Sequence, residues 1–493
     1  MENASARRAM AALALLFLAK AVLLALFVTP LWEVPDESGH YAYVQDLADG
    51  KGLPIYGKSP LPEAVISHWK AGPQTGNPPP PFNWVAQHPP LYHFLAVPFL
   101  AGARLLTEGI EWHLRAPRLF SAIAGAAALL LFFRVLREAT EDAAFALVAA
   151  GAVSFLPMYT HLASGTHHEV LMALAGGAAA LFFVRLVKSG EFSEGIKMAG
   201  ALAAAGGIKL TAVPLSLALV ALAGKHLSAK SGKKLAQWLA IALAAFTIPA
   251  LWALRNWMTI GHPLAHPSGR SFRLSELLTH LQEQPVLDHT FKNFLGLIGW
   301  MGTGEPRWFQ ISGAFLALYL LLGLIVALSA AVWLWKNARS ALRRIPPLAV
   351  FCFCLLALSA GGSGPVSPLK RLLYSLLAAL PFFCIARIGR RSSFRDEIVT
   401  SSQFVFLVFG LAYFFNVWRG YAIYGEMRAV HGRYFFAILP FLILSMAYPA
   451  VLLWQNRKRR DLAMILVLAA FFANEAAFFL MRVLPFYAEG RLR

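Results

Sequence analysis

Long apolar segments, separated by short basic stretches, constrain the fold of this chain more than any other feature of its sequence. Of its 493 residues, 58% are hydrophobic and 14% are charged, whereas a soluble domain carries roughly 25% charged residues. A helix of about 20 apolar residues crosses a bilayer and satisfies its own backbone hydrogen bonds there. The sequence therefore predicts an all-α membrane protein with many spans and no soluble domain.

The basic residues indicate how the spans are oriented. A net charge of +19 would suggest nucleic-acid binding in a soluble protein, but here the lysines and arginines cluster in short loops, as expected for cytoplasmic loops. Arg7 and Arg8 place the N-terminus inside. The first apolar segment is too long for a signal peptide and no A-x-A site follows it, so we expect a retained span. The three cysteines form no CxxC pair and indicate neither disulfides nor zinc.

These features predict about thirteen transmembrane helices, with the N-terminus inside and the C-terminus outside. Two long outer-face loops, 30–117 and 255–310, are expected to carry short juxtamembrane helices. Residues 1–310 form the predicted catalytic module, and residues 311–493 the predicted helices around a lipid-donor groove. The predicted spans lie near 9–29, 118–136, 143–161, 167–187, 235–254, 311–335, 346–361, 370–386, 400–418, 433–454 and 461–481, with two half-length helices within 198–223.

Two segments need a separate argument. The apolar stretch 89–105 is expected to lie at the interface, because the helix near 118–136 already makes the return crossing. The stretch 198–223 has basic residues beyond both ends and is interrupted at Gly206-Gly207-Ile208-Lys209 and at Pro214. Two half-length helices fit that pattern, and such breaks are tolerated where they line a cavity. The charge of Lys209 at that depth needs a partner or a phosphate.

An acidic and histidine cluster follows the first span, with Pro35-Asp36-Glu37 and His40 within a few residues. Ionisable groups at a membrane boundary are costly unless they pair, bind a metal or do chemistry. Further carboxylates, imidazoles and guanidinium groups fall on the same predicted outer face. Arginine binds phosphate oxygens through its planar fork, and a carboxylate can deprotonate a hydroxyl. We therefore place the candidate active site at this cluster.

Each of these residues also has a simpler explanation. Asp36 and Glu37 can begin an interfacial helix as its cap and first-turn acid, and Glu169 can be the first-turn acid of its span. Arg255 can be a snorkelling residue beside a span, and Arg433 can anchor the start of one. The imidazoles can be ordinary loop or interfacial residues; these are His88, His167 and His168.

Several motifs in this order resemble the GT-C superfamily of polytopic glycosyltransferases, which includes the protein O-mannosyltransferases and the bacterial lipid A aminoarabinose transferases. The resemblance extends over nearly the whole chain. The motifs that carry it are Pro35-Asp36-Glu37, His40-Tyr41-Ala42-Tyr43, Gln87-His88-Pro89-Pro90-Leu91-Tyr92, Arg118-Leu119-Phe120-Ser121, Gly207-Ile208-Lys209-Leu210-Thr211, Arg255-Asn256-Trp257, Phe294 to Gly302 and His431-Gly432-Arg433-Tyr434-Phe435.

The resemblance implies transfer of a sugar from a polyprenyl-phosphate donor on the outer face, with Asp36 as catalytic base or metal ligand. Glu37 is the adjacent acid, and Glu169 matches a second acid in the next short outer loop. We expect an inverting reaction in which Asp36, supported by Glu37, takes the proton of the acceptor hydroxyl while basic residues hold the departing phosphate. The residues assigned to substrate binding are His40, His88, Tyr92, Lys209, Arg255, Asn256, Arg433 and Tyr434.

The sequence departs from the family at two places. His167-His168-Glu169 stands where related sequences commonly have Asn-Asn-Asp, and His88 stands where the aminoarabinose branch has lysine. A glutamate with imidazoles can hold a divalent metal, so Asp36, Glu169 and His168 are candidate ligands for Mg²⁺ or Mn²⁺.

Other functions remain open at this stage. A polymerase or ligase acting on lipid-linked sugars would share the outer-face site, and the large second loop keeps that alternative. A flippase for lipid-linked sugars would share the broken helices, but the chain has no two-half repeat. A scaffold would have no use for the acid–base cluster. The expected location is a bacterial inner membrane with the site on the periplasmic face, and the acceptor is a glycan, a lipid or a protein.

Overall fold

The computed structural model describes residues 3–71, 81–228, 233–264, 286–296, 313–338, 393–424, 430–454 and 456–485. Apart from one isolated bridge between Pro60 and Phe82, the regular structure in these ranges is helical. The helices are α1 (Asn3–Leu23), η1 (Leu24–Val28), α2 (Glu37–Ala48), α3 (Glu63–Ala71), η2 (Trp84–Gln87), α4 (Leu91–Leu106), α5 (Ile110–Arg115), α6 (Pro117–Thr140), α7 (Ala143–Val153), α8 (Pro157–Ala163), α9 (Glu169–Ser189), α10 (Phe192–Ile208), η3 (Leu210–Ala212), α11 (Val213–His226), α12 (Lys234–Ile260), α14 (Val286–Leu295), α15 (Gly313–Ala338), α18 (Phe394–Tyr424), η4 (Gly432–Ile438), α19 (Leu439–Leu453), α20 (Arg457–Phe478) and η5 (Phe479–Val483).

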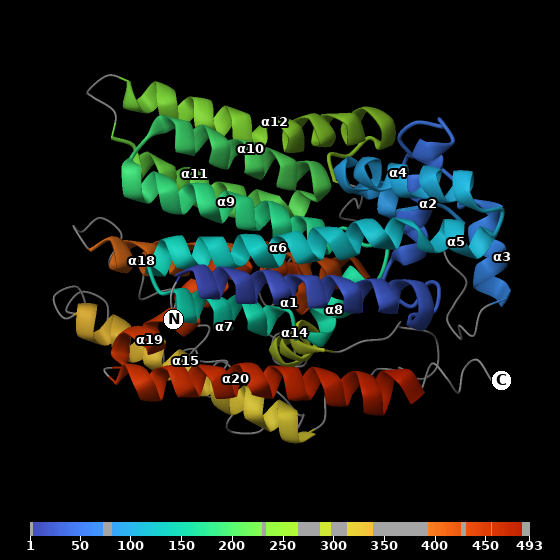
Figure 1. Cartoon of the computed structure of the whole chain (residues 1–493). Coiled ribbons are helices and arrows are strands. Elements are labelled where there is room, and N and C mark those ends of the chain that lie inside the picture. Colours follow the sequence, from blue (N-terminus) through green and yellow to red (C-terminus); the bar gives the residue numbers. More distant parts are fainter. Residues whose placement is uncertain are drawn as a thin grey trace.

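The long helices run side by side in one bundle, and the short helices α2, α3, α4 and α5 gather at one end of it (Figure 1). Helix α6 packs between α1 and α9, and α9 packs in turn against α10, which contacts α12. The described parts of the predicted outer loop 30–117 thus form a helical cap over one end of the bundle. This arrangement leaves the starts of α2 and α9 close together at the capped end.

Local sequence explains where the central helices begin and end. Pro117 occupies the first turn of α6, where its missing N–H costs nothing. Asp142 caps α7 by accepting hydrogen bonds from the backbone N–H groups of Ala144 and Phe145. Gly176 in α9 faces η4 so closely that a Cβ atom there would overlap the carbonyl oxygen of Ala437. Only glycine permits this approach of α9 to η4, and η4 carries Arg433.

Eight helices in the described ranges are long and apolar enough to cross a membrane, or nine if the bent pair α7–α8 is one span. The multi-pass membrane architecture is therefore confirmed, but the predicted total of about thirteen spans is not. Predicted spans 346–361 and 370–386, and most of the second outer loop, lie outside the described residues.

The structure also refines three predicted segments. The segment predicted as a span at 143–161 is bent: the chain turns by 65° between α7 and α8, and Pro157 begins the second piece. The break predicted within 198–223 is confirmed, since α10 ends at Ile208 and α11 starts at Val213. The segment predicted to lie at the interface forms α4, whose 16 residues place it among the shorter apolar helices rather than the candidate spans.

Candidate active site

Asp36 lies at the start of α2 in a left-handed backbone conformation, with φ 61°. Aspartate tolerates this region better than most residues. Its side chain does not cap α2. Instead Oδ1 accepts a hydrogen bond of 2.9 Å from the indole N–H of Trp84, and Oδ2 lies 3.4 Å from Nη2 of Arg433. The Asp36 side chain is 36% exposed, whereas those of Glu37 and Glu169 are 1% exposed. Of the three predicted catalytic carboxylates, Asp36 is the accessible one.

Glu37 is buried and pairs with Arg118 of α6. Its two carboxylate oxygens accept 2.7 Å hydrogen bonds from Nε and Nη2 of the guanidinium group. They also accept the backbone N–H groups of Trp32 and Thr166, each at 2.9 Å. The remaining N–H groups of Arg118 bond to backbone carbonyls of Ala25, Thr29 and Pro30. Glu37 thus accepts four hydrogen bonds, and Arg118 donates five. Through these bonds the pair, which acts as a clamp, holds together the end of the first span, the start of α2 and the loop before α9.

Glu169 and Lys209 form a second buried pair. Lys209 Nζ lies 2.5 Å from Glu169 Oε1 and 4.1 Å from the ring centroid of Tyr434. Lys209 follows the last residue of α10 in extended backbone geometry, so the break between α10 and α11 aims its side chain at α9. Lys209, whose charge was predicted to need a partner, therefore contacts a carboxylate and the face of an aromatic ring. Together these hold its ammonium group next to the start of α9.

Arg433 enters the site from the C-terminal part of the chain. Its backbone N–H donates to Asn293 Oδ1 of α14 at 3.2 Å. The preceding Gly432 contacts α14 so closely that a Cβ would overlap the carbonyl oxygen of Thr290. The guanidinium carbon lies 5.9 Å from the ring centroid of Tyr434. Residues 397 positions apart in sequence, Asp36 and Arg433, thus meet at one point.

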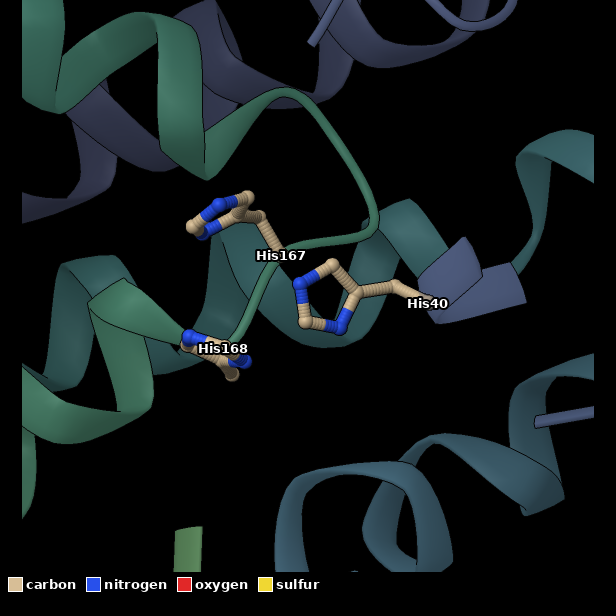
Figure 2. Close-up of side chains that lie close together, drawn as sticks. All are labelled: His40, His167 and His168. Atoms are coloured by element: carbon tan, nitrogen blue, oxygen red, sulfur yellow. The ribbon is translucent and has the colours of Figure 1, made fainter. Parts of the chain in front are cut away.

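Three imidazole rings lie close together, one from α2 and two from the loop before α9 (Figure 2). One ligand atom from each of His40, His167 and His168 lies within 4.8 Å of the others, and all three side chains are buried. His93 of α4 adds a fourth ring, with its Nε2 3.0 Å from Nδ1 of His40. Burial lowers the pKa of His40, His167 and His168 well below the usual value, and that of His93 to about 3. These rings are therefore neutral at pH 7.

Two of the predicted substrate-binding residues, Tyr92 and His88, border this histidine cluster, and a third, Tyr434, borders Lys209. The Tyr92 ring lies 5.9 Å from that of His40, and its hydroxyl pairs with Ser121 Oγ at 2.7 Å. The His88 ring lies 4.8 Å from that of His168. Tyr434 lies against Lys209 on the other side.

Arg255 and Asn256 have other contacts. The Arg255 guanidinium stacks over Trp252 and donates to the carbonyl oxygens of Leu53 and Pro54 at 3.1 and 3.0 Å. Asn256 is buried and faces the carbonyl of Pro263. These contacts join the end of α12 to the outer cap, and none of them connects Arg255 to Asp36 or Lys209.

The predicted metal ligands are not gathered into one group. Among the described residues, Asp36, Glu169 and His168 do not form a set of neighbouring ligand atoms, because Asp36 bonds to Trp84 and Arg433 and Glu169 bonds to Lys209. His168 Nε2 does lie 3.6 Å from Glu169 Oε1. The group that the fold assembles is His40, His167 and His168.

Sequence reasoning assigned no role to Trp84, His93 or Arg118, each of which holds a site residue in place. Arg118 had one signal, since it stands in a motif of the family resemblance. Trp84 precedes the His88 motif by only a few residues, but nothing in the sequence connects it to Asp36. His93 is an unremarked residue of an apolar helix, and only the packing of α4 against α2 brings it to His40.

Comparisons with known proteins bear on this site. Residues 87–252 match the family model described as dolichyl-phosphate-mannose-protein mannosyltransferase. The matched range contains His88, Arg118, Glu169 and Lys209. It confirms the resemblance to the GT-C glycosyltransferases and indicates a membrane glycosyltransferase of that type. A search of curated protein sequences finds no match.

Two solved structures of ArnT from Cupriavidus metallidurans superpose on the chain. The one bound to undecaprenyl phosphate has 14% sequence identity and a TM-score of 0.40, and the apo form has 13% and 0.37. Each superposition covers 98% of this chain and 77% of the other. Both TM-scores lie below 0.5, so these two structures do not by themselves establish a shared fold.

Proposed function

We propose that this GT-C type glycosyltransferase moves a sugar from a polyprenyl-phosphate donor to an acceptor hydroxyl at the capped end of its helix bundle, on the outer face of the membrane. The observation that carries the proposal is the separation of roles among the three carboxylates. Glu37 and Glu169 are buried in ion pairs, whereas Asp36 is partly exposed and held by two donors. An accessible, oriented carboxylate at a membrane boundary suits a general base.

In this mechanism the acceptor hydroxyl approaches the anomeric carbon on the face opposite the phosphate, which inverts the configuration. Asp36 takes the hydroxyl proton as the new C–O bond forms. Trp84 donates to one oxygen of Asp36 and Arg433 to the other, and together they orient the carboxylate. A lipid phosphate is already a good leaving group, so no general acid is required, in contrast to a glycosidase.

In this proposal two cations, Lys209 and Arg433, bind the phosphate. When Asp36 becomes protonated, Arg433 loses the charge of its partner and turns to the departing phosphate, where its fork binds two oxygens. Lys209 stays beside Glu169 and Tyr434, and it contributes a point charge on the other side. Glu37 acts through position, because it fixes the backbone on both sides of Asp36.

The family description supports a polyprenyl-phosphate donor, since it names dolichyl-phosphate mannose. It does not fix the sugar or the acceptor of this chain. A flippase of lipid-linked sugars would not need an exposed base oriented by two donors. A polymerase or a ligase would share such a base, and no observation among the described residues favours one of them.

The test is transfer by purified protein in nanodiscs, supplied with a panel of radiolabelled polyprenyl-phosphate sugars and membrane extracts as acceptors. Wild type should release polyprenyl phosphate and Asp36→Asn should not, with a loss of at least about 100-fold if proton removal is catalytic. Asp49→Asn is the matched control, because Asp49 follows the same helix α2 and bonds only to surface cations. Equal release by wild type and Asp36→Asn would remove Asp36 as the base.

A further inference from the structure

The charges of the site are already balanced before a donor binds. Asp36 faces Arg433, Glu37 faces Arg118 and Glu169 faces Lys209, so three carboxylates meet three cations. A sugar phosphodiester brings one negative charge, and the phosphate monoester that leaves carries about two. Protonation of Asp36 frees one cation, Arg433, to meet that charge. The reaction therefore has use for further positive charge close to Lys209.

The histidine cluster lies at that place and has nitrogen atoms without hydrogen-bond partners. Both ring nitrogens of His168 and Nε2 of His40 are buried and make no hydrogen bond. A buried polar atom without a partner carries a desolvation cost, and each such atom in a native structure calls for an explanation. His168 Nε2 also lies 3.6 Å from Glu169, the partner of Lys209.

We propose that His40, His167 and His168 bind one divalent transition-metal cation, with Zn²⁺ as the best match, next to the Glu169–Lys209 pair. Metal binding at this site does not depend on the proposed function. Only the role of the metal, as an additional positive charge for the donor phosphate, rests on the proposed function. Neutral imidazoles select zinc and its neighbours, whereas Mg²⁺ and Mn²⁺ prefer oxygen ligands. Three histidines with an open fourth position are a known arrangement for catalytic zinc.

The geometry is close to what zinc requires. With zinc–nitrogen distances of about 2.0–2.1 Å, two ligand atoms of a tetrahedral site stand about 3.3 Å apart. The three ligand atoms here lie within 4.8 Å of one another, so shifts of about 1 Å close the site. His167 Nδ1 accepts the backbone N–H of Glu169 at 3.2 Å. His167 joins the metal by giving up that long hydrogen bond or by turning its ring.

His93 completes the arrangement as a positioning residue. When the Nδ1–H of His40 donates to Nε2 of His93, the lone pair of His40 remains on Nε2, the atom without a partner. Figure 2 shows a ring nitrogen of His40 on the side that faces the other two rings. Tyr43 stacks on His93 with ring centroids 3.9 Å apart and holds it in place. Such outer partners typically fix the tautomer of a metal-binding histidine.

The experiment measures metal binding without any donor, so that it stands or falls separately from glycosyl transfer. Full-length protein in nanodiscs is stripped with a chelator, titrated with Zn²⁺ or Co²⁺, and analysed for bound metal by mass spectrometry. Wild type should bind about one cation per chain. His168→Asn and His40→Asn should weaken binding at least about tenfold, and His93→Phe should weaken it about 10–100-fold.

His113→Gln is the control, because His113 lies on α5 in the same cap and its ring bonds only to the carbonyl of Thr107. No binding by wild type, or equal binding by wild type and both ligand variants, overturns the proposal. If the variants do not fold, Cu²⁺ bound to wild type provides a second measurement. Its electron paramagnetic resonance spectrum should show coupling to three nitrogens, and a spectrum without nitrogen coupling also overturns the site.

Discussion

Glu37 and Asp36 are neighbours in sequence, but we expect their mutations to have different effects. Changing Glu37 should lower the stability of the protein, whereas changing Asp36 should leave stability nearly unchanged and abolish transfer. Glu37→Gln keeps the shape of the side chain but replaces one acceptor oxygen by an NH₂ group. That group then faces Nη2 of Arg118 and the backbone N–H of Trp32, which are both donors. The Arg118 cation also loses the carboxylate with which it pairs. Breaking a buried pair in this way costs about 3–5 kcal/mol. The partly exposed Asp36 should cost about 1 kcal/mol or less when changed to asparagine.

The assay is the apparent melting temperature of purified protein in one detergent, followed by tryptophan fluorescence. Glu37→Gln should melt several degrees below wild type, while Asp36→Asn should melt close to wild type and yet fail to transfer sugar. A double-mutant cycle adds a second check: Glu37→Met with Arg118→Met should cost less than the sum of the single changes, because the pair is coupled. Unchanged melting of Glu37→Gln, or strict additivity in the cycle, would refute the clamp.

Three further outcomes follow from the same contacts. Gly176→Ala should lower the free energy of unfolding by about 1–3 kcal/mol and should also lower transfer, because the new Cβ overlaps Ala437 and forces η4 away from α9. If the variant behaves like wild type in melting and transfer assays, this close contact is not needed. Lys209→Met should destabilise the protein, because it leaves the buried Glu169 carboxylate without its partner. Adding Glu169→Gln to Lys209→Met should restore the melting temperature but not sugar transfer. Restored transfer in the double variant would show that Lys209 does not bind the phosphate. Acid should destabilise the protein, because the unfolded chain takes up protons below about pH 6.5 while the buried His168 does not: stability is full above that pH and falls below it, by about 2 kcal/mol per such imidazole between pH 7 and pH 5. Melting scans at the two pH values check this, and His168→Asn should reduce the difference.

Much of the site was predictable because membrane burial of charge leaves a strong local signal. Asp36 stands out beside a span in a chain with few acids, and Lys209 stands out within an apolar stretch broken by glycines. In the structure Asp36 meets Arg433, and Lys209 pairs with Glu169. The contacts of Glu37 and Arg255 were harder to predict from the sequence. A glutamate in a buried ion pair is the same residue type as a catalytic acid, and an arginine that bonds to a loop is the same residue type as a phosphate ligand.

The sequence alone determined the class of the molecule, its orientation signals and its main break, because hydrophobic length and charge placement act locally along the chain. It also placed Asp36, the proposed base, directly after the first span. Tertiary structure decided which charges are already paired, that Arg433 reaches Asp36 from the far end of the chain, and that four imidazoles from α2, α4 and the loop before α9 converge. Those contacts depend on how helices remote in sequence pack against one another, and glycines such as Gly176 and Gly432 set how closely they approach.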